Sequence, residues 1–157
     1  MNKHPNWQKG ETLIEALGAL AIVAIVITAV TMVITTALSN ALFNENQTLA
    51  TKFAQQGIET VRQVRNTDYS AYRSYNGLYC LGKGQTTLGT PQSRCSTPNA
   101  DTFIRSVTIE QSPGCAPNVS RVIVRVAFTS GKCQPNTYCH AQTHTSCLST
   151  VNPNKGL

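Results

Sequence analysis

Charged side chains are absent from a long stretch near the start of the chain. From Ala16 to Leu38 the sequence reads ALGALAIVAIVITAVTMVITTAL, 23 residues without Asp, Glu, Lys or Arg. About 20 residues at 1.5 Å rise each cross a hydrocarbon core of roughly 30 Å, so this run predicts a transmembrane helix. Lys3 and Lys9 precede it, with no acidic residue before Glu11. Because basic flanks stay in the cytoplasm, we expect the remainder of the chain to be exported.

A cleaved secretory signal is the alternative for this segment. Ala37, Ser39 and Ala41 are small residues that would suit a signal protease. The apolar run is, however, longer than the usual hydrophobic region of a signal peptide, about 7–15 residues. The helical pattern also continues beyond it, which favours a retained helix.

The next segment, up to Asn66, contains no Pro and has its apolar residues on one helical arc. Glu45, Lys52, Glu59 and Arg62 fill the opposite side. The pattern predicts one helix from about residue 12 to 66, whose second half packs against a globular head. The apolar arc consists of Leu42, Leu49, Ala50, Phe53, Gly57, Val61 and Val64.

Residues 67–102 are rich in Gly, Ser, Thr, Tyr and Pro and have no period, so we expect an irregular connector. Its tyrosines, interpreted as covering a helix–sheet seam, could alternatively form a stacking platform for nucleic acid bases. These are Tyr69, Tyr72, Tyr75 and Tyr79.

Alternating patterns then predict strands over 102–110 and 121–128, with a third expected from 138 to 150. In the first, Phe103, Arg105, Val107 and Ile109 share one face; in the second, Val122, Val124, Val126 and Phe128 do so. A small antiparallel sheet over residues 103–157, packed on the helix, would bury these faces. The predicted fold class is therefore α+β.

Composition supports export of this head. Only 13% of the 157 residues are charged, about half the usual share for a soluble domain. Six cysteines, all after residue 79, favour an oxidising compartment and three disulfides, for which 15 connectivities exist. Cys80 with Cys95 is the preferred local pair, and the others stay open. The candidates are Cys80, Cys95, Cys115, Cys133, Cys139 and Cys147.

Metal binding and catalysis are weaker interpretations of the same residues. Cys139, His140, His144 and Cys147 could supply zinc ligands, but their spacing does not match paired knuckles. Cys147 with His140 or His144 could alternatively form a catalytic Cys–His pair. No Gly-rich phosphate loop or His-Glu zinc helix occurs. We therefore expect no metal, no cofactor and no enzymatic activity.

Basic residues predominate after Leu38, with 11 Lys and Arg against five Asp and Glu. A basic head can contact DNA or an acidic surface. Because these charges form no run, ordinary solvation is the favoured interpretation, with DNA contact as the alternative. They include Arg73, Lys83, Arg94, Arg105, Arg121, Arg125 and Lys132.

The most informative residues lie at the cytoplasmic mouth of the apolar run, in Lys9-Gly-Glu-Thr-Leu-Ile-Glu15. Glu11 would lie near a helix N-terminus, where the dipole favours negative charge. Glu15 lies deeper, and an unpaired carboxylate in lipid costs several kcal/mol. An acid in that position is a functional candidate that needs a positively charged partner.

This segment resembles the precursors of type IV pilins and of type II secretion pseudopilins. Their short basic leader ends in Gly, and Phe-Thr-Leu-Ile-Glu then opens a long apolar helix. The matching residues are Gly10, Thr12, Leu13, Ile14 and Glu15, whereas Glu11 replaces the usual Phe. The likeness is strong over about 30 residues and looser beyond them.

The resemblance implies that residues 1–10 are a leader, cut by a prepilin peptidase between Gly10 and Glu11, with N-methylation of Glu11. The departure at that position leaves efficient methylation open and weakly favours a minor subunit. The mature helix, 11–66, would assemble with other pilin subunits at an inner-membrane platform. Glu15 would neutralise the N-terminal amine of a neighbouring subunit. Thr12, Leu13 and Ile14 belong to the same assembly segment.

Two functional interpretations follow. The first is a structural subunit held in the inner membrane, with its N-terminus inside and head outside, and then added to a pilus or pseudopilus. The second is a single-pass anchored protein whose disulfide-bonded head binds a partner without polymerisation.

Overall fold

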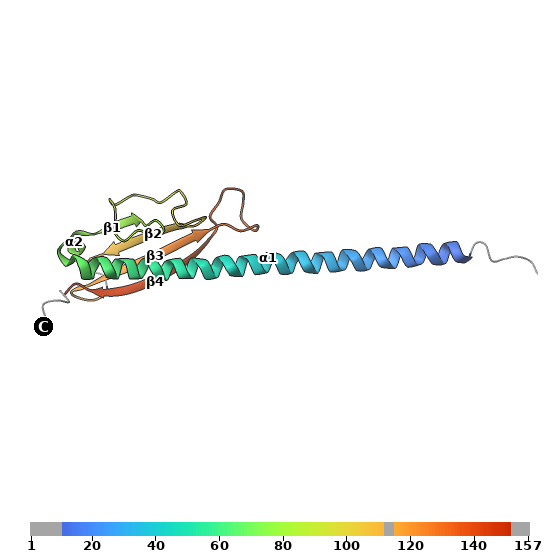
Figure 1. Ribbon diagram of the computed structural model, residues 1–157, viewed down its shortest axis with the longest axis horizontal. Coiled ribbons are helices and arrows are strands. Elements are labelled where there is room, and N and C mark those ends of the chain that lie inside the picture. The colour runs from blue at the N-terminus through green and yellow to red at the C-terminus, as the bar shows by residue number, and fades with distance from the viewer. Residues whose placement is uncertain (1–10, 112–114, 152–157) are drawn as a thin grey trace, which may run out of the picture. The chain divides into compact units, whose positions relative to one another are not determined.

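The computed structural model describes residues 11–111 and 115–151 and confirms the expected α+β class (Figure 1). The chain divides into two compact units, one up to Ala41 and one from Leu42 onward, and helix α1 contributes to both. The elements are α1 (Glu11–Thr67), α2 (Tyr69–Ser74), β1 (Gly77–Cys80), β2 (Ile104–Glu110), β3 (Val119–Phe128) and β4 (His140–Ser149).

Helix α1 is continuous over its 57 residues, close to the predicted range of 12 to 66. No Pro interrupts it, so no turn loses its backbone hydrogen bond. Arg65 lies in its last turn, where a cation is favoured by the helix dipole. The backbone N–H of Asp68 donates to the Val64 carbonyl at 2.9 Å and closes the helix.

The sheet has the strand order β1-β2-β3-β4, and all neighbours are antiparallel. The segments expected at 102–110, 121–128 and 138–150 are strands β2, β3 and β4, as predicted. Val107 lies opposite Val124, and Ile109 lies opposite Val122. This register brings the predicted apolar faces of the two strands onto the same side of the sheet.

The expectation of an irregular connector over 67–102 is wrong at its beginning. Asp68 accepts a hydrogen bond from the Ala71 backbone N–H at 2.9 Å and caps α2, which buries Tyr72. Strand β1 follows and pairs with β2, with Tyr79 opposite Val107. Both elements are too short to show a period in the sequence, and tertiary pairing stabilises them.

The core of the second unit lies between α1 and the sheet. The predicted arc is buried from Ala50 onward, whereas Leu49 is partly buried and Leu42 is 53% exposed. Phe43 takes the place of Leu42, with its ring centroid 6.1 Å from that of Phe128. The predicted sheet faces are buried, including Arg105. The core consists mainly of Ala50, Phe53, Ala54, Val61, Tyr72, Tyr79, Leu81, Phe103, Val107, Ile109, Val122, Val124, Val126, Phe128 and Leu148.

Gly57 allows α1 to approach β3 closely. A Cβ atom at this position would lie 2.7 Å from Cγ1 and 3.2 Å from Cγ2 of Val124, a fully buried side chain. Helix interiors normally disfavour Gly by about 1 kcal/mol relative to Ala. The close packing of helix on strand compensates for that cost.

Replacing Gly57 by Leu should lower the free energy of unfolding by about 3 kcal/mol, because overpacking displaces Val124 and its neighbours. Denaturant unfolding of the detergent-solubilised chain measures this change. The matched control is Gly89→Leu, where an added Cβ atom meets nothing within 4 Å. In a double-mutant cycle, Val124→Ala should relieve part of the Gly57→Leu loss; strictly additive losses would contradict the proposed contact.

Candidate functional site

The first unit presents a long apolar surface. From Leu13 to Leu38 the large apolar side chains are between 51 and 74% exposed. The helix is long and apolar enough to cross a membrane. An exposed apolar surface of this extent requires lipid or protein around it. This segment is therefore the principal candidate for a functional surface.

The threonine hydroxyls of the apolar run bond to backbone carbonyls of the helix itself. The hydroxyls of Thr31 and Thr36 donate to the carbonyls of Ile27 and Met32, each at 2.8 Å. Thr28 and Thr35 bond in the same manner to carbonyls three or four residues earlier. Lipid offers no alternative partner, so this pattern suits a membrane environment.

Glu15 is the exception on this surface. Its carboxylate is exposed, and the next charged residue along α1 is Glu45. Among the side chains that the structure describes, no basic group lies within ion-pair distance of it. A charge of this kind, adjacent to an apolar surface, can be stabilised only by solvent, lipid headgroups or another molecule.

The other predicted assembly residues are placed in part. Leu13 and Ile14 are 65 and 74% exposed on α1. Glu11 and Thr12 belong to its first turn, and their side chains are not described. Gly10, with the rest of the predicted leader, lies outside the described residues, so the cleavage site stays a prediction.

Three disulfides staple the head, and the pair predicted from sequence, Cys80–Cys95, is confirmed. The two pairings that the sequence left open are Cys115–Cys147, which links the segment before β3 to β4, and Cys133–Cys139, which closes the loop between β3 and β4. Because every cysteine is oxidised, the head suits a compartment outside the reducing cytosol.

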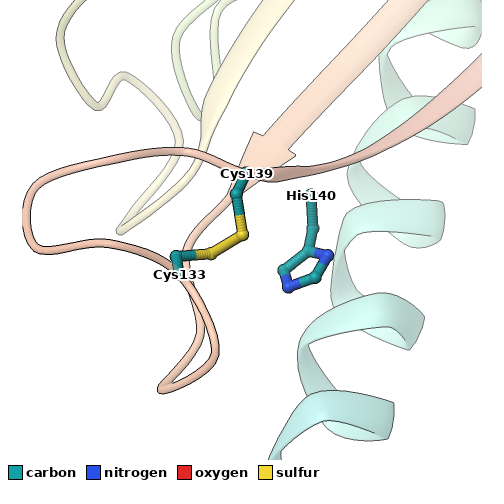
Figure 2. A group of neighbouring side chains, drawn as sticks. All are labelled: Cys133, Cys139 and His140. Carbon is teal, nitrogen blue, oxygen red and sulfur yellow. A yellow bond between two sulfur atoms is a disulfide. The ribbon is translucent and has the colours of Figure 1, made fainter.

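His140 lies beside the Cys133–Cys139 disulfide, as Figure 2 shows. Its Nε2 atom is 3.0 Å from the Ser130 hydroxyl, and its ring packs on Phe43 with centroids 5.0 Å apart. Both sulfur atoms are committed to the disulfide and are not thiolates, the form that ligates zinc. In this state the disulfide and the Ser130–His140 contact hold the loop between β3 and β4. Of the three side chains, the His140 imidazole alone is left to bind a metal.

The four side chains of the zinc alternative are not brought together. Cys147 is bonded to Cys115, and Cys139 to Cys133. In β4, His144 lies opposite the buried Val124, whereas Cys147 lies opposite Arg121 on the other face. Cys147, the cysteine considered for a catalytic Cys–His pair, lies on the opposite face of β4 from His140 and His144, and its sulfur is bonded to Cys115.

The tyrosines of the connector cover the core, as predicted, and do not form a stacking platform. Tyr72 and Tyr79 are almost completely buried, and Tyr75 packs edge-on against Tyr79 with centroids 5.5 Å apart. The Tyr72 hydroxyl shares a buried hydrogen bond with Ser120. Burial raises the pKa of Tyr72, which keeps the phenol neutral.

Arg105 corrects the expectation that the basic residues of the head are solvated. Its side chain is 2% exposed, and Nε donates to the Leu81 carbonyl at 2.9 Å. Nη1 donates to the Phe53 carbonyl at 3.3 Å, and Nη2 to that of Gly82. Desolvation lowers the pKa of this guanidinium. Arg105 therefore ties β2 to α1 and to the segment after β1, and it is unavailable to a partner.

The alternating strand pattern favoured burial of Arg105, whereas its charge favoured an exposed position. Arg105 alternates with Phe103, Val107 and Ile109, which the strand pattern placed on the core face. The cluster of Phe43, Phe128 and His140 had no comparable signal, because its members come from three separate elements.

Comparison of the chain with protein-family models, curated proteins and solved structures finds no match. The long apolar helix and the disulfide-bonded sheet by themselves fit a membrane-anchored head domain.

Proposed function

We propose that this chain is a prepilin-like structural subunit, held in the inner membrane by α1 and assembled through that helix into a type IV pilus or a secretion pseudopilus. The observation that carries the proposal is Glu15, an unpaired acid at the inner end of an uncharged, exposed apolar helix. A helix that only anchors a protein in the membrane does not require a carboxylate at this end of its apolar segment.

Cleavage after Gly10 would supply the missing partner. The new chain would begin with an α-amino group at Glu11, which is largely protonated at neutral pH because its ordinary pKa is about 7.7–8.0. In a low-dielectric filament core, the amine of one subunit and the Glu15 carboxylate of the next attract strongly, whereas each charge alone is penalised. Pairing would therefore favour docking of an incoming subunit in one register.

The disulfides support the orientation in this proposal. Oxidised cysteines are typical of exported segments, which agrees with a head outside the membrane and a basic N-terminus inside. The head would then be displayed on the filament surface. The Glu11 departure from the family pattern supports a minor subunit.

N-terminal sequencing of the chain purified from membranes tests the processing step. We expect a mature chain that starts at Glu11, with the leader removed. An intact Met1 would support the single-pass anchored protein that does not polymerise. A start near residue 40 would instead identify α1 as part of a cleaved signal. Substitution of Gly10 by Ala should block the cleavage and leave full-length precursor in the membrane.

A further inference from the structure

A cleft of about 540 Å³ lies on the face of the sheet that is turned away from the core. Strands β2 and β3 form its floor, where Ser106 lies opposite Arg125 and Ile104 lies opposite Ala127. Ile104 and Ala127 are only 9 and 7% exposed, although they face away from α1. Loops therefore cover this end of the outer face and give the cleft its walls.

Both walls are held by disulfides. One contains Ser93, Arg94 and Ser96 and is attached to β1 through Cys80–Cys95. The other, residues 136–138, belongs to the loop that Cys133–Cys139 closes. A cleft whose walls are covalently restrained loses little conformational entropy when a ligand binds.

The charge of the cleft is positive and uncompensated. Arg94 and Arg125 line it and are exposed, and none of its lining residues is acidic. Within the described part of the chain, no carboxylate is in ion-pair distance of either guanidinium. By contrast, Lys83 and Arg62 each pair with a carboxylate, at 2.8 and 2.6 Å. The cleft is thus suited to an anion.

The remaining lining groups indicate which anion. Hydroxyl and amide groups surround the two arginines, and the ring of Tyr138 is the one aromatic ring among the lining residues. The polar lining residues are Ser93, Ser96, Ser106, Asn136, Thr137 and Tyr138. Single-stranded nucleic acid is bound by several aromatic rings along a basic groove, which this cleft lacks. Sugar hydroxyls pair with hydroxyl and amide groups, and a planar carboxylate is bound in bidentate fashion by a guanidinium. The volume is within the usual range for small-ligand pockets, about 300–1,000 Å³.

We propose that this cleft binds a short acidic saccharide of the uronic acid type. Arg94 and Arg125 bind its carboxylates, and the surrounding hydroxyl and amide groups bind its ring hydroxyls. The proposal does not depend on filament assembly, because every residue involved belongs to the unit that begins at Leu42.

Calorimetric titration of the full chain in detergent micelles tests this inference. The acidic probe is a linear trimer of galacturonic acid. The neutral probe is the galactose trimer of the same linkage, in which each carboxylate is replaced by a hydroxymethyl group. The third probe is a thymidine oligonucleotide of the same charge as the acidic trimer. We expect only the acidic trimer to bind. Arg94→Gln and Arg125→Gln should each weaken binding by about tenfold, the effect of losing one charge-assisted hydrogen-bonding group.

The matched control is Arg73→Gln, which removes the same charge from the exposed surface of α2, outside the cleft. It should leave the affinity unchanged. The proposal would be overturned if the wild-type chain bound none of the probes, bound the neutral trimer equally well or preferred the oligonucleotide. It would also be overturned if Arg73→Gln weakened binding as much as the two cleft variants. Far-UV circular dichroism of the variants establishes that their fold is retained.

Discussion

Replacing Glu15 by Gln should leave the chain inserted in the membrane and cleaved after Gly10, yet reduce its incorporation into filaments by at least about tenfold. The physical reason is the uncompensated amine at residue 11. Loss of one partner of a buried ion pair costs about 3–5 kcal/mol, because the other charge stays buried without compensation. Co-sedimentation of the protein with sheared filaments, normalised to its amount in the membrane, measures the effect.

Glu45→Gln is the matched control for this experiment. It removes the next acid along α1, which is also exposed, and should leave incorporation unchanged. N-terminal sequencing of both variants shows that processing has occurred, so an assembly defect is separated from a cleavage defect. Incorporation of Glu15→Gln at the wild-type level would exclude the proposed ion pair, even if the chain proved to be a filament subunit.

Removing the Cys115–Cys147 disulfide should produce the largest loss of head stability among the three bridges. It joins residues 32 positions apart, whereas Cys133 and Cys139 are six apart and Cys80 and Cys95 are 15 apart. In the chain-entropy description, the bridges stabilise by about 3.7, 2.2 and 3 kcal/mol respectively, because a longer loop restricts the unfolded chain more. Cys115→Ser with Cys147→Ser should therefore lower the free energy of unfolding by nearly 4 kcal/mol.

Denaturant unfolding under non-reducing conditions measures this loss. The paired substitution of Cys133 and Cys139 by Ser is the internal control, since it also removes one bridge and leaves no unpaired cysteine. Equal losses for the two double variants would show that loop length does not govern these contributions. Thiol titration of each variant confirms that the remaining two bridges are formed.

The elements that sequence reasoning predicted correctly are those with a long, local period. The apolar stripe of α1 and the alternation of inward and outward residues in β2 and β3 repeat over many residues. The buried face of each element can therefore be identified without the tertiary structure. The Cys80–Cys95 pairing could be predicted for a similar reason, because it closes a short segment between neighbouring elements.

The failures share a different cause. Helix α2 and strand β1 have six and four residues, which is too few for a pattern to emerge from noise. The burial of Arg105 depends on carbonyls of Phe53, Leu81 and Gly82, which come from α1 and from the segment after β1. A cation could be accommodated in the core only because the fold supplied these acceptors.

For this protein, the sequence alone determined the length and apolar character of α1, the position of Glu15 and the faces of the main strands. These properties depend on residues that are close together in the chain. Only the tertiary structure decided two of the three disulfide pairings, the solvent-excluded position of Arg105 and the meeting of Arg94 with Arg125 in one cleft. Each of these requires segments distant in sequence to be juxtaposed, and local hydrophobic patterning carries no information about which distant segments will meet.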